Sequence, residues 1–470
     1  MPQRSQATGG AERTARVSFR APISGVAPLV GALWVSISAL ILVPLGAIVW
    51  IALEGQRFEV LLDEDVLEAS INSLTSAVGS ALAAVLVGTA LAIVVERTNT
   101  FGARGLGLLA LTPLLMPPFV GAIAWLGIAG PAAPINLWWR DRFGSPLWSV
   151  YGADGVILLL TIHSYPLVML IVIAALRRIP ADLEHAARVA GAGPVRSVMT
   201  VTVPLLRPAL LASFLLVAVG NLADFGIPSI IGLPERFTTL ATLVYRFLQS
   251  GTVDDPLVVV ASIGLVLLII ALVGVVLSSR FGDRGHEVDG SASRPERLPL
   301  GRARLLVSVT AWVAVAIVTV APLLALLAQA LLRAPGLPLT AENLTTDNIG
   351  RAVTAQTTLD GASNSIMLAG LAAIVCGVIG LAIGVVTTRT RLASAAPLRT
   401  ITLLPQAIPG IVIAVAWLVL APSIGLFNTP WLILCAYITS FIAIVVQAVT
   451  APLAATPSSA EDAARIAGAG

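Results

Sequence analysis

Long apolar runs separated by short polar stretches make up most of the chain. A run of about 20 apolar residues is long enough to cross the roughly 30 Å hydrocarbon core of a bilayer as a helix. The runs predict ten such helices, at 27–53, 70–95, 106–130, 155–176, 208–232, 256–279, 304–332, 362–387, 398–422 and 430–454. The predicted fold class is therefore an all-α polytopic membrane protein.

Composition narrows the class further. Of the 470 residues, 57% are hydrophobic and only 11% are charged, which excludes a soluble globular domain. The three histidines are dispersed and both cysteines, Cys376 and Cys435, lie in apolar runs, so neither a metal site nor a disulfide framework is indicated. All 28 basic residues are arginine, which rules out a phosphate-loop lysine and a Schiff-base lysine. We therefore expect no cofactor and no enzymatic reaction on this chain, and any driving ATP on another subunit.

Arginine is distributed unevenly between the two sides of the predicted helices. With the N-terminus inside, the inner segments hold 21 Arg and 10 acidic residues, whereas the outer loops hold 7 Arg and 14 acidic residues. Short cytoplasmic loops retain positive charge during membrane insertion, so this bias predicts a cytoplasmic N-terminus. The first apolar run is too long for a signal peptide, and we expect it to be retained as a helix.

An internal repeat links the two parts of the chain. Asn72-Ser73, Pro113, Pro117 and Trp125 recur at a single offset of 292, as Asn364-Ser365, Pro405, Pro409 and Trp417. The segment 184–193, EHAARVAGAG, recurs at 461–470 as EDAARIAGAG, at an offset of 277. An even number of predicted helices separates the copies, so both copies have the same orientation in the membrane.

The first decapeptide opens a longer pattern, EHAARVAGAGPVRSVMTVTVPLLRP, in a loop that the charge bias places inside. The pattern resembles the EAA loop of ABC importer permeases: Ala186-Ala187, then Gly191, then aliphatic residues ahead of Pro204. The alanines predict a short helix with a small-residue face that can dock closely on another protein, and Gly191 predicts a sharp turn after it. An amphipathic interfacial helix without a partner is the simpler alternative, and the duplication argues against it.

The resemblance implies a type I ABC importer transmembrane domain built as two parallel six-helix repeats, the second truncated. It also implies a cytoplasmic ABC ATPase homodimer that carries ATP and Mg, an extracytoplasmic substrate-binding protein, and a place in the lipid bilayer of a bacterial plasma (inner) membrane, with no nucleic acid as partner. The residues it assigns to ATPase coupling are Glu184, His185, Ala186, Ala187, Arg188, Gly191, Pro204, Glu461, Asp462, Ala463, Ala464 and Gly468. Where the family has its first acidic residue this chain has His185 and Asp462, and the preceding Glu184 and Glu461 can substitute.

The same reasoning divides the chain into four parts: a cytoplasmic tail at 1–26, a first transmembrane domain at 27–279 with its EAA loop at 181–204, a linker at 280–303, and a second domain at 304–470 with its EAA loop beginning at 457. The second copy of the loop reaches Gly470 at the point where the first continues to Pro204. By symmetry, two more helices in roughly 88 residues are expected after it.

The cargo and the pathway rest on weaker signals. The fused halves and the segment 221–232, NLADFGIPSIIG, resemble the ferric-iron group of these importers, which implies ferric iron; thiamine, polyamines and phosphonates are alternatives. An acid inside a membrane helix is costly, so Asp224 is a functional suspect, and we expect Asp224 and Asn221 on the substrate pathway. The competing interpretation is an acid that caps or pairs at a helix end. We also expect Asn72 and Asn364 to cap the helices that they open.

Two other classes remain as alternatives to an ABC importer permease. An ion-coupled secondary transporter with two parallel halves would give the same hydropathy, but it has no need of a duplicated EAA loop. A membrane enzyme lacks any supporting motif, such as His-Glu-x-x-His.

Overall fold

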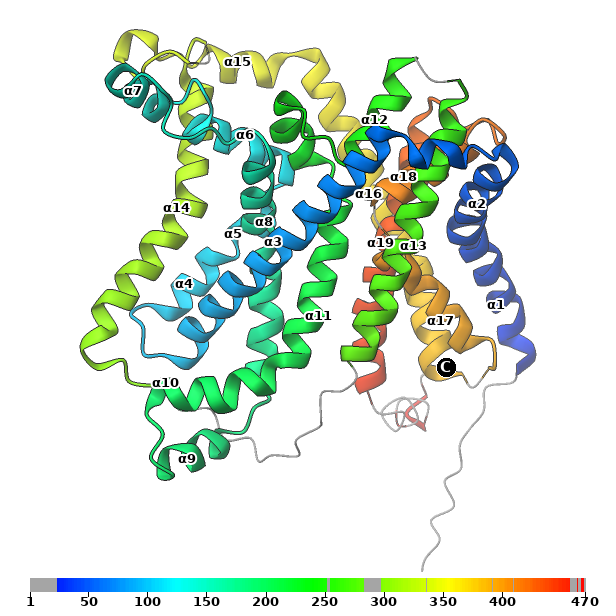
Figure 1. Ribbon diagram of the computed structural model, residues 1–470. Helices are drawn as coiled ribbons and strands as arrows, with labels where there is room; N and C mark the ends of the chain where they lie inside the picture. Colours follow the sequence, from blue (N-terminus) through cyan, green and yellow to red (C-terminus); the bar gives the residue numbers. More distant parts are fainter. Residues whose placement is uncertain are drawn as a thin grey trace, which may run out of the picture.

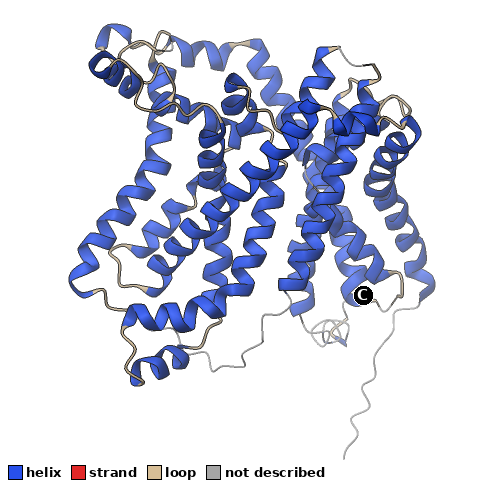
Figure 2. Cartoon of the chain, viewed as in Figure 1, coloured by secondary structure: helices blue, strands red, loops and turns tan. Residues whose placement is uncertain are grey.

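The computed structural model describes residues 23–251, 254–282, 297–334, 336–390, 392–408, 410–456, 463 and 466–468. Figure 2 shows that helices form nearly all of the regular structure of these residues. The helices are α1 (Ile23–Ile37), α2 (Val43–Gly55), α3 (Glu64–Arg97), α4 (Ala103–Ala110), α5 (Thr112–Leu115), α6 (Pro118–Ala129), α7 (Pro134–Phe143), α8 (Ala153–Leu176), α9 (Ala181–Val189), α10 (Pro194–Ser197), α11 (Val203–Leu222), α12 (Leu240–Ser250), α13 (Pro256–Gly282), α14 (Arg304–Leu331), α15 (Asp347–Thr354), α16 (Gln356–Arg389), α17 (Ala395–Leu403), α18 (Gly410–Leu420) and α19 (Pro430–Ala455).

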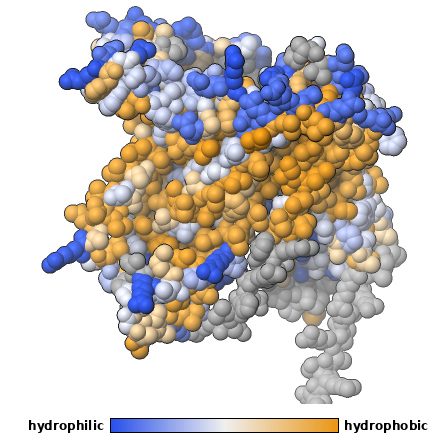
Figure 3. Space-filling model, viewed as in Figure 1, coloured by the Kyte–Doolittle hydropathy of each residue, from blue (hydrophilic) through white to orange (hydrophobic). Residues whose placement is uncertain are grey.

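The all-α polytopic fold class is confirmed. Across the described residues, nine helices are long and apolar enough to cross a membrane, and the bent pair 395–406 and 410–420 makes a tenth if it counts as one span. Many large apolar side chains on these helices are exposed, and Figure 3 shows them as a broad apolar belt beneath a polar rim. Such a belt is the surface that a bilayer covers.

Two of the predicted helices are broken. The run 106–130 was expected as one helix, but the chain forms α4, α5 and α6, with extended backbone at Met116 and Pro117. The run 398–422 likewise divides into α17, a 3-10 turn and α18. Proline lacks a backbone N–H and its ring crowds the preceding turn, so Pro113, Pro117 and Pro118 account for the first break.

The predicted helix 208–232 is displaced by several residues. Helical backbone begins earlier, at Pro194 with α10, continues through a π-helical turn at Val198–Thr202 into α11, and ends at Leu222. A separate helical turn follows at Pro228–Gly232. Pro228 and the nearby Gly226 favour this interruption, which hydropathy alone does not register.

The helices recur at the offsets found in the sequence. α3 and α16 have 34 residues each, and their first residues, Glu64 and Gln356, are 292 apart. α8 and α19 begin at Ala153 and Pro430, which are 277 apart. In each pair a glycine lets two helices approach closely: a Cβ on Gly88 would lie 2.8 Å from Val168 Cβ, and one on Gly380 would lie 2.8 Å from Val445 Cγ1.

The first helix of each part of the chain packs on the other part. Ile37 and Ile41, at the junction of α1 and α2, share an apolar core with Cys376 of α16. In the opposite direction, Val315 of α14 shares a core with Leu106 of α4. Figure 1 shows α14 beside α4 and α6 on one flank, and α1 and α2 beside α17 and α18 on the other. The two parts are therefore interlocked through their first helices.

Loop helices gather at the two ends of the bundle. Figure 1 places α9 and α10 at one end, and α7, α12 and α15 at the other. This is the separation that the arginine count requires, because 177–207 was predicted to be inner and the segments holding α7, α12 and α15 to be outer.

Candidate functional site

The EAA-like loop folds as a short helix closed by a glycine turn. α9 follows Pro180 and carries Asp182 in its first turn and Arg188 in its last, which suits the direction of the helix dipole. It ends in a Schellman motif: Ala192 N donates to Ala187 O at 3.0 Å, and Gly191 N donates to Arg188 O at 2.9 Å. Gly191 has φ +89°, the left-handed conformation that glycine adopts without a Cβ penalty.

The second copy of the loop forms the same turn where it is described. Ala467 N donates to Ala463 O at 3.0 Å, which matches the bond from Ala190 N to Ala186 O, also at 3.0 Å. Gly468 has φ +93°, close to the value of Gly191, its counterpart at the offset of 277. The other predicted residues of this copy, Glu461, Asp462 and Ala464, lie outside the described residues.

At one equivalent position, each copy has an aliphatic side chain that is almost fully exposed. Val189, the last residue of α9, is 90% exposed, and Ile466, its counterpart at the same offset, is 89% exposed. On α9, His185 and Ala186 are also exposed, whereas Ala187 and Arg188 are half-buried. Figure 1 shows α9 projecting beyond the membrane helices at the end of the bundle. An exposed aliphatic tip beside an alanine is suited to insertion into a cleft of another protein.

Glu184, by contrast, points into the protein. Its carboxylate is buried, lies 3.6 Å from Nη1 of the fully buried Arg97, and accepts a hydrogen bond from the Thr202 hydroxyl. Ser197 donates to the Glu184 carbonyl at 3.4 Å. Pro204 lies two residues beyond Thr202, at the second position of α11. Of the two residues at the start of the motif, Glu184 is therefore buried and His185 is at the surface.

Comparisons with known proteins identify the family of the chain. Residues 84–284, which include the EAA-like loop, match the family model described as the binding-protein-dependent transport system inner membrane component. A probable molybdenum ABC transporter permease protein of Haloferax volcanii is 30% identical over 236 residues, 49% of this chain and 84% of that protein. The chain belongs to this family of permeases.

Two further relatives differ in the cargo that their names state. The permease is 28% identical over 205 residues to the putrescine transport system permease protein PotI of Escherichia coli, which covers 43% of the permease and 69% of that protein. It is also 28% identical over 211 residues to the ferric transport system permease protein FbpB of Actinobacillus pleuropneumoniae, which covers 43% of the permease and 30% of that protein. Relatives at similar identity thus include proteins named for three different cargoes.

Asp224 lies at a helix break and not within a helix. The prediction that placed it inside the helix 208–232 was wrong, because α11 ends two residues before it. Its Oδ1 accepts a hydrogen bond from Ile227 N at 2.9 Å, so it caps the following helical turn, as in the competing interpretation from the sequence. Gly226 packs closely on the start of α6, since a Cβ there would lie 3.2 Å from Phe119 N.

Asn221 is buried between three helices of the permease. Its amide nitrogen donates to Ser80 Oγ of α3 at 2.9 Å, and its carbonyl accepts from Ser164 Oγ of α8 at 2.7 Å. Thr161 of α8 also donates to the Ser80 carbonyl at 3.4 Å. These bonds join α3, α8 and α11, and both the nitrogen and the oxygen of the Asn221 amide are hydrogen-bonded.

The predicted capping role of Asn72 and Asn364 was wrong, because each lies eight residues inside its helix. Asn72 instead donates to the Thr238 carbonyl at 3.1 Å, and the neighbouring Ser73 hydroxyl accepts from Leu240 N at 2.7 Å. Asn364 and Ser365 are exposed. The pair in the first half thus anchors the segment that leads into α12.

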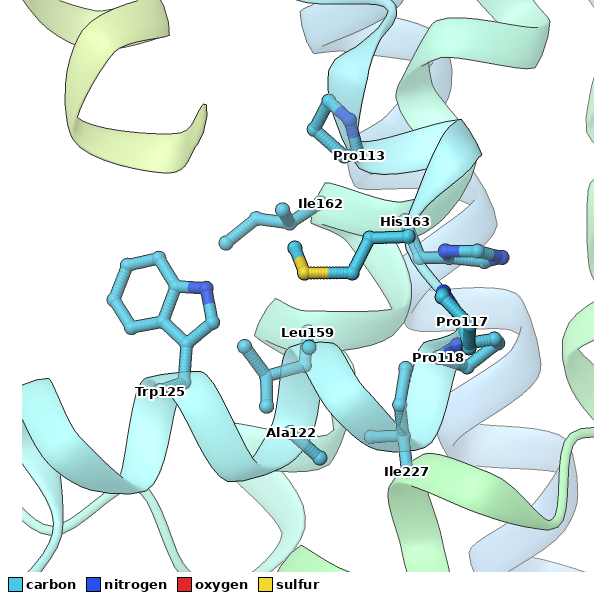
Figure 4. A pocket seen from close by; sticks show the side chains of 11 residues that line it. Pro113, Pro117, Pro118, Ala122, Trp125, Leu159, Ile162, His163 and Ile227 are labelled. Atoms are coloured by element: carbon cyan, nitrogen blue, oxygen red, sulfur yellow. The ribbon is translucent and has the colours of Figure 1, made fainter. Parts of the chain in front are cut away.

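A small apolar pocket lies at the broken helix. Pro113, Pro117 and Trp125 of the broken helix line it together with His163 of α8 and Ile227, and Figure 4 shows Trp125 across from Pro117 and His163. His163 is the single ionisable side chain among the lining residues. The pocket marks the place where α5, α6 and α8 meet the turn capped by Asp224.

Arg97 is the residue of this site that the sequence reasoning missed. It was counted only as an inner positive charge, yet it is buried against Glu184. A signal was present: Arg97-Thr98 recurs as Arg389-Thr390 at the offset of 292, and each arginine ends a 34-residue helix.

Proposed function

We propose that this permease is the transmembrane subunit of an ATP-driven importer and couples to a separate cytoplasmic ABC ATPase through its two EAA loops. The observation that carries the proposal is the duplicated helix end, with Val189 and Ile466 exposed at one offset and a left-handed glycine two residues beyond each. Two similar helix ends suit two identical clefts, which a homodimeric ATPase would supply.

The arginine bias supports a cytoplasmic position for the end of the bundle that carries α9. The N-terminus is then cytoplasmic as well. The membrane that holds the permease would be the plasma (inner) membrane of a bacterium. ATP and Mg would bind to the ATPase, since the chain contains no lysine for a phosphate loop. A substrate-binding protein would dock at the opposite end, near α7, α12 and α15.

The proposed mechanism is alternating access driven by the ATPase. ATP binding closes the ATPase dimer and draws the two EAA helices together, and the two parallel halves, at 27–279 and 304–470, rock against each other. The exchanged first helices, α1–α2 and α14, support this scheme because each ties one half to the other. The permease performs no covalent chemistry.

For the cargo we propose ferric iron, with a polyamine, thiamine or phosphonate as the alternative. The similarity to a protein named as a ferric transport permease supports this choice, as does the segment 221–232. The test is uptake of radioactive ferric citrate, putrescine, thiamine, a phosphonate and molybdate by membrane vesicles that carry the permease with the ATPase and binding protein encoded beside it. Selective ferric uptake is expected, and selective uptake of any other solute would overturn the choice of cargo.

The energy source is tested in the same vesicles. We expect uptake to require internal ATP and to persist when a protonophore and a sodium ionophore collapse the ion gradients. Uptake that stops with these ionophores and continues without ATP would identify a secondary transporter and refute the proposed function.

A further inference from the structure

Arg97 joins two helix ends at the cytoplasmic side of the first half. Its Nη2 donates to the carbonyl of Leu176, the last residue of α8, at 2.9 Å. Its Nη1 lies 3.6 Å from the carboxylate of Glu184, in α9. Two nitrogens of one planar guanidinium therefore contact α8 and α9. A lysine has one ammonium nitrogen and cannot make both contacts with the same geometry.

The ion pair is sealed from solvent. The side chains of Arg97 and Glu184 are 0% and 3% exposed, and Thr202, which donates to the same carboxylate, is fully buried. Breaking a buried pair by removing one partner leaves an uncompensated charge, whereas an exposed pair contributes little. Loss of Arg97 should therefore release α9 from α3.

The backbone that follows Arg97 is fastened to the start of the second half. Leu298 N donates to the Arg97 carbonyl at 2.8 Å. Arg304, the first residue of α14, donates to the Asn99 carbonyl at 2.7 Å and lies 3.8 Å from the centre of the Phe101 ring. Trp312 of α14 donates to the Phe101 carbonyl at 2.9 Å. A movement of the end of α3 is thus passed directly to α14.

We propose that Arg97 is a positioning residue that fixes α9 to α3, so that displacement of the EAA helix by the ATPase moves α3 and α14 with it. The inference rests on the proposed function for its role in coupling, but the anchor itself is a property of the chain alone. The second half repeats the arginine: Arg389 ends α16 and donates to the Thr456 carbonyl, just beyond α19, at 3.3 Å. Its repeat partner, Glu461, lies outside the described residues.

The anchor is tested by the distance between spin labels at Val189 and Leu86, which are 90% and 72% exposed on α9 and α3. Cys376 and Cys435 are first replaced by Ala, and the full chain is measured in nanodiscs by double electron–electron resonance. We expect a narrow distribution for the parent, a broad one for Arg97→Met, and an intermediate one for Arg97→Lys. A distribution as narrow in Arg97→Met as in the parent would overturn the proposal.

A matched control comes from the neighbouring pair Arg177–Glu96, which joins the same region at 2.9 Å but has its arginine largely exposed. Arg177→Met should leave the distribution unchanged. If Arg97→Met does not fold, the double variant Arg97→Met/Glu184→Leu is used, because it removes both charges. A broad distance distribution in the double variant supports the anchor. A distribution as narrow as that of the parent shows that packing alone holds α9.

Coupling is tested in the complex with the ATPase. Arg97→Lys is expected to assemble with the ATPase and to hydrolyse ATP, but to lower uptake per ATP roughly ten-fold, within the ordinary range of coupling free energies. Unchanged uptake per ATP would overturn the coupling role. If the parent chain binds no ATPase, the proposed function fails, while the spin-label result still stands or falls by itself.

Discussion

α3 and its counterpart α16 have equal lengths and matching ends, yet their surroundings differ. Both pack along a glycine, against α8 and α19 respectively. The first turns of α3 are also covered by the segment before α12, so Ser73 is buried and hydrogen-bonded to Leu240 N. The matching Ser365 is exposed among the described residues. The same local sequence therefore specifies the same helix, and the neighbours alone decide which of its polar groups become structural.

A similar comparison holds for the two EAA loops. Both copies have the helix end, the left-handed glycine and the exposed aliphatic residue, and these are the features that face outward. The family's acidic position differs between the copies, as His185 and Asp462. The backbone geometry and the exposed aliphatic residue are thus common to the two copies, whereas the charge at the family's acidic position is not.

The largest expected effect is at Gly191. A Cβ there would meet no atom within 4 Å, so a substitution is penalised only by the left-handed backbone, by about 1–2 kcal/mol. Gly191→Val should abolish uptake while its level in the membrane stays normal, and Gly191→Asn, which tolerates this conformation, should retain most uptake. Gly468→Val should behave like Gly191→Val. Full uptake with only one of the two valine variants would refute the equivalence of the two copies, and full uptake with both would refute the need for the glycine turn in uptake.

The next largest effect concerns the glycines at which α3 packs on α8 and α16 packs on α19. A Cβ on Gly88 would lie 2.7 Å from the Tyr165 carbonyl oxygen, which is backbone, whereas the nearest atom to one on Gly380 is the side-chain Cγ1 of Val445. Gly88→Ala should destabilise the protein by about 1–3 kcal/mol. Gly380→Ala should be nearly neutral, because a rotamer shift of about 1 kcal/mol is offset by better helix propensity. Thermal unfolding in detergent measures both, and equal losses would contradict the comparison.

The smallest effect concerns the repeated asparagines. Asn72→Ala should cost about 1 kcal/mol, since it removes the hydrogen bond to the Thr238 carbonyl. Asn364→Ala alters an exposed side chain and should change stability by no more than about 0.5 kcal/mol in the same chain. The same thermal unfolding assay compares them, and the reverse order would show that the surroundings of α3 and α16 have been misassigned.

The sequence predicted the features that depend on local chemistry. Apolar runs placed the membrane helices, the offsets of 292 and 277 paired α3 with α16 and α8 with α19, and Gly191 has the backbone that its position in the motif suggested. A further repeat passed unnoticed: Trp34 and Pro44 recur as Trp312 and Pro322 at an offset of 278. It relates the first helices of the two halves.

What the sequence did not predict depends on tertiary contacts. In a hydropathy average the apolar neighbours outweigh Pro117 and Pro118, although these prolines break the span at α6. Arg97 was counted as a solvated inner charge because its partner, Glu184, is 87 residues away in the sequence. Asp224 was assigned to a helix interior because the end of α11 depends on a break near Gly226 that no periodicity marks.

The central claim, that both EAA loops dock on one ATPase, is tested most directly by cross-linking. Val189→Cys and Ile466→Cys are made singly in a chain without Cys376 and Cys435, labelled with a photoactivatable maleimide, and assembled with the ATPase in membranes. A third variant, Trp138→Cys in α7 at the opposite end, serves as the control. The account predicts cross-links to the ATPase from positions 189 and 466 and none from 138. Labelling of 189 and 466 by an impermeant reagent from the outside, with no cross-link from either, would contradict it.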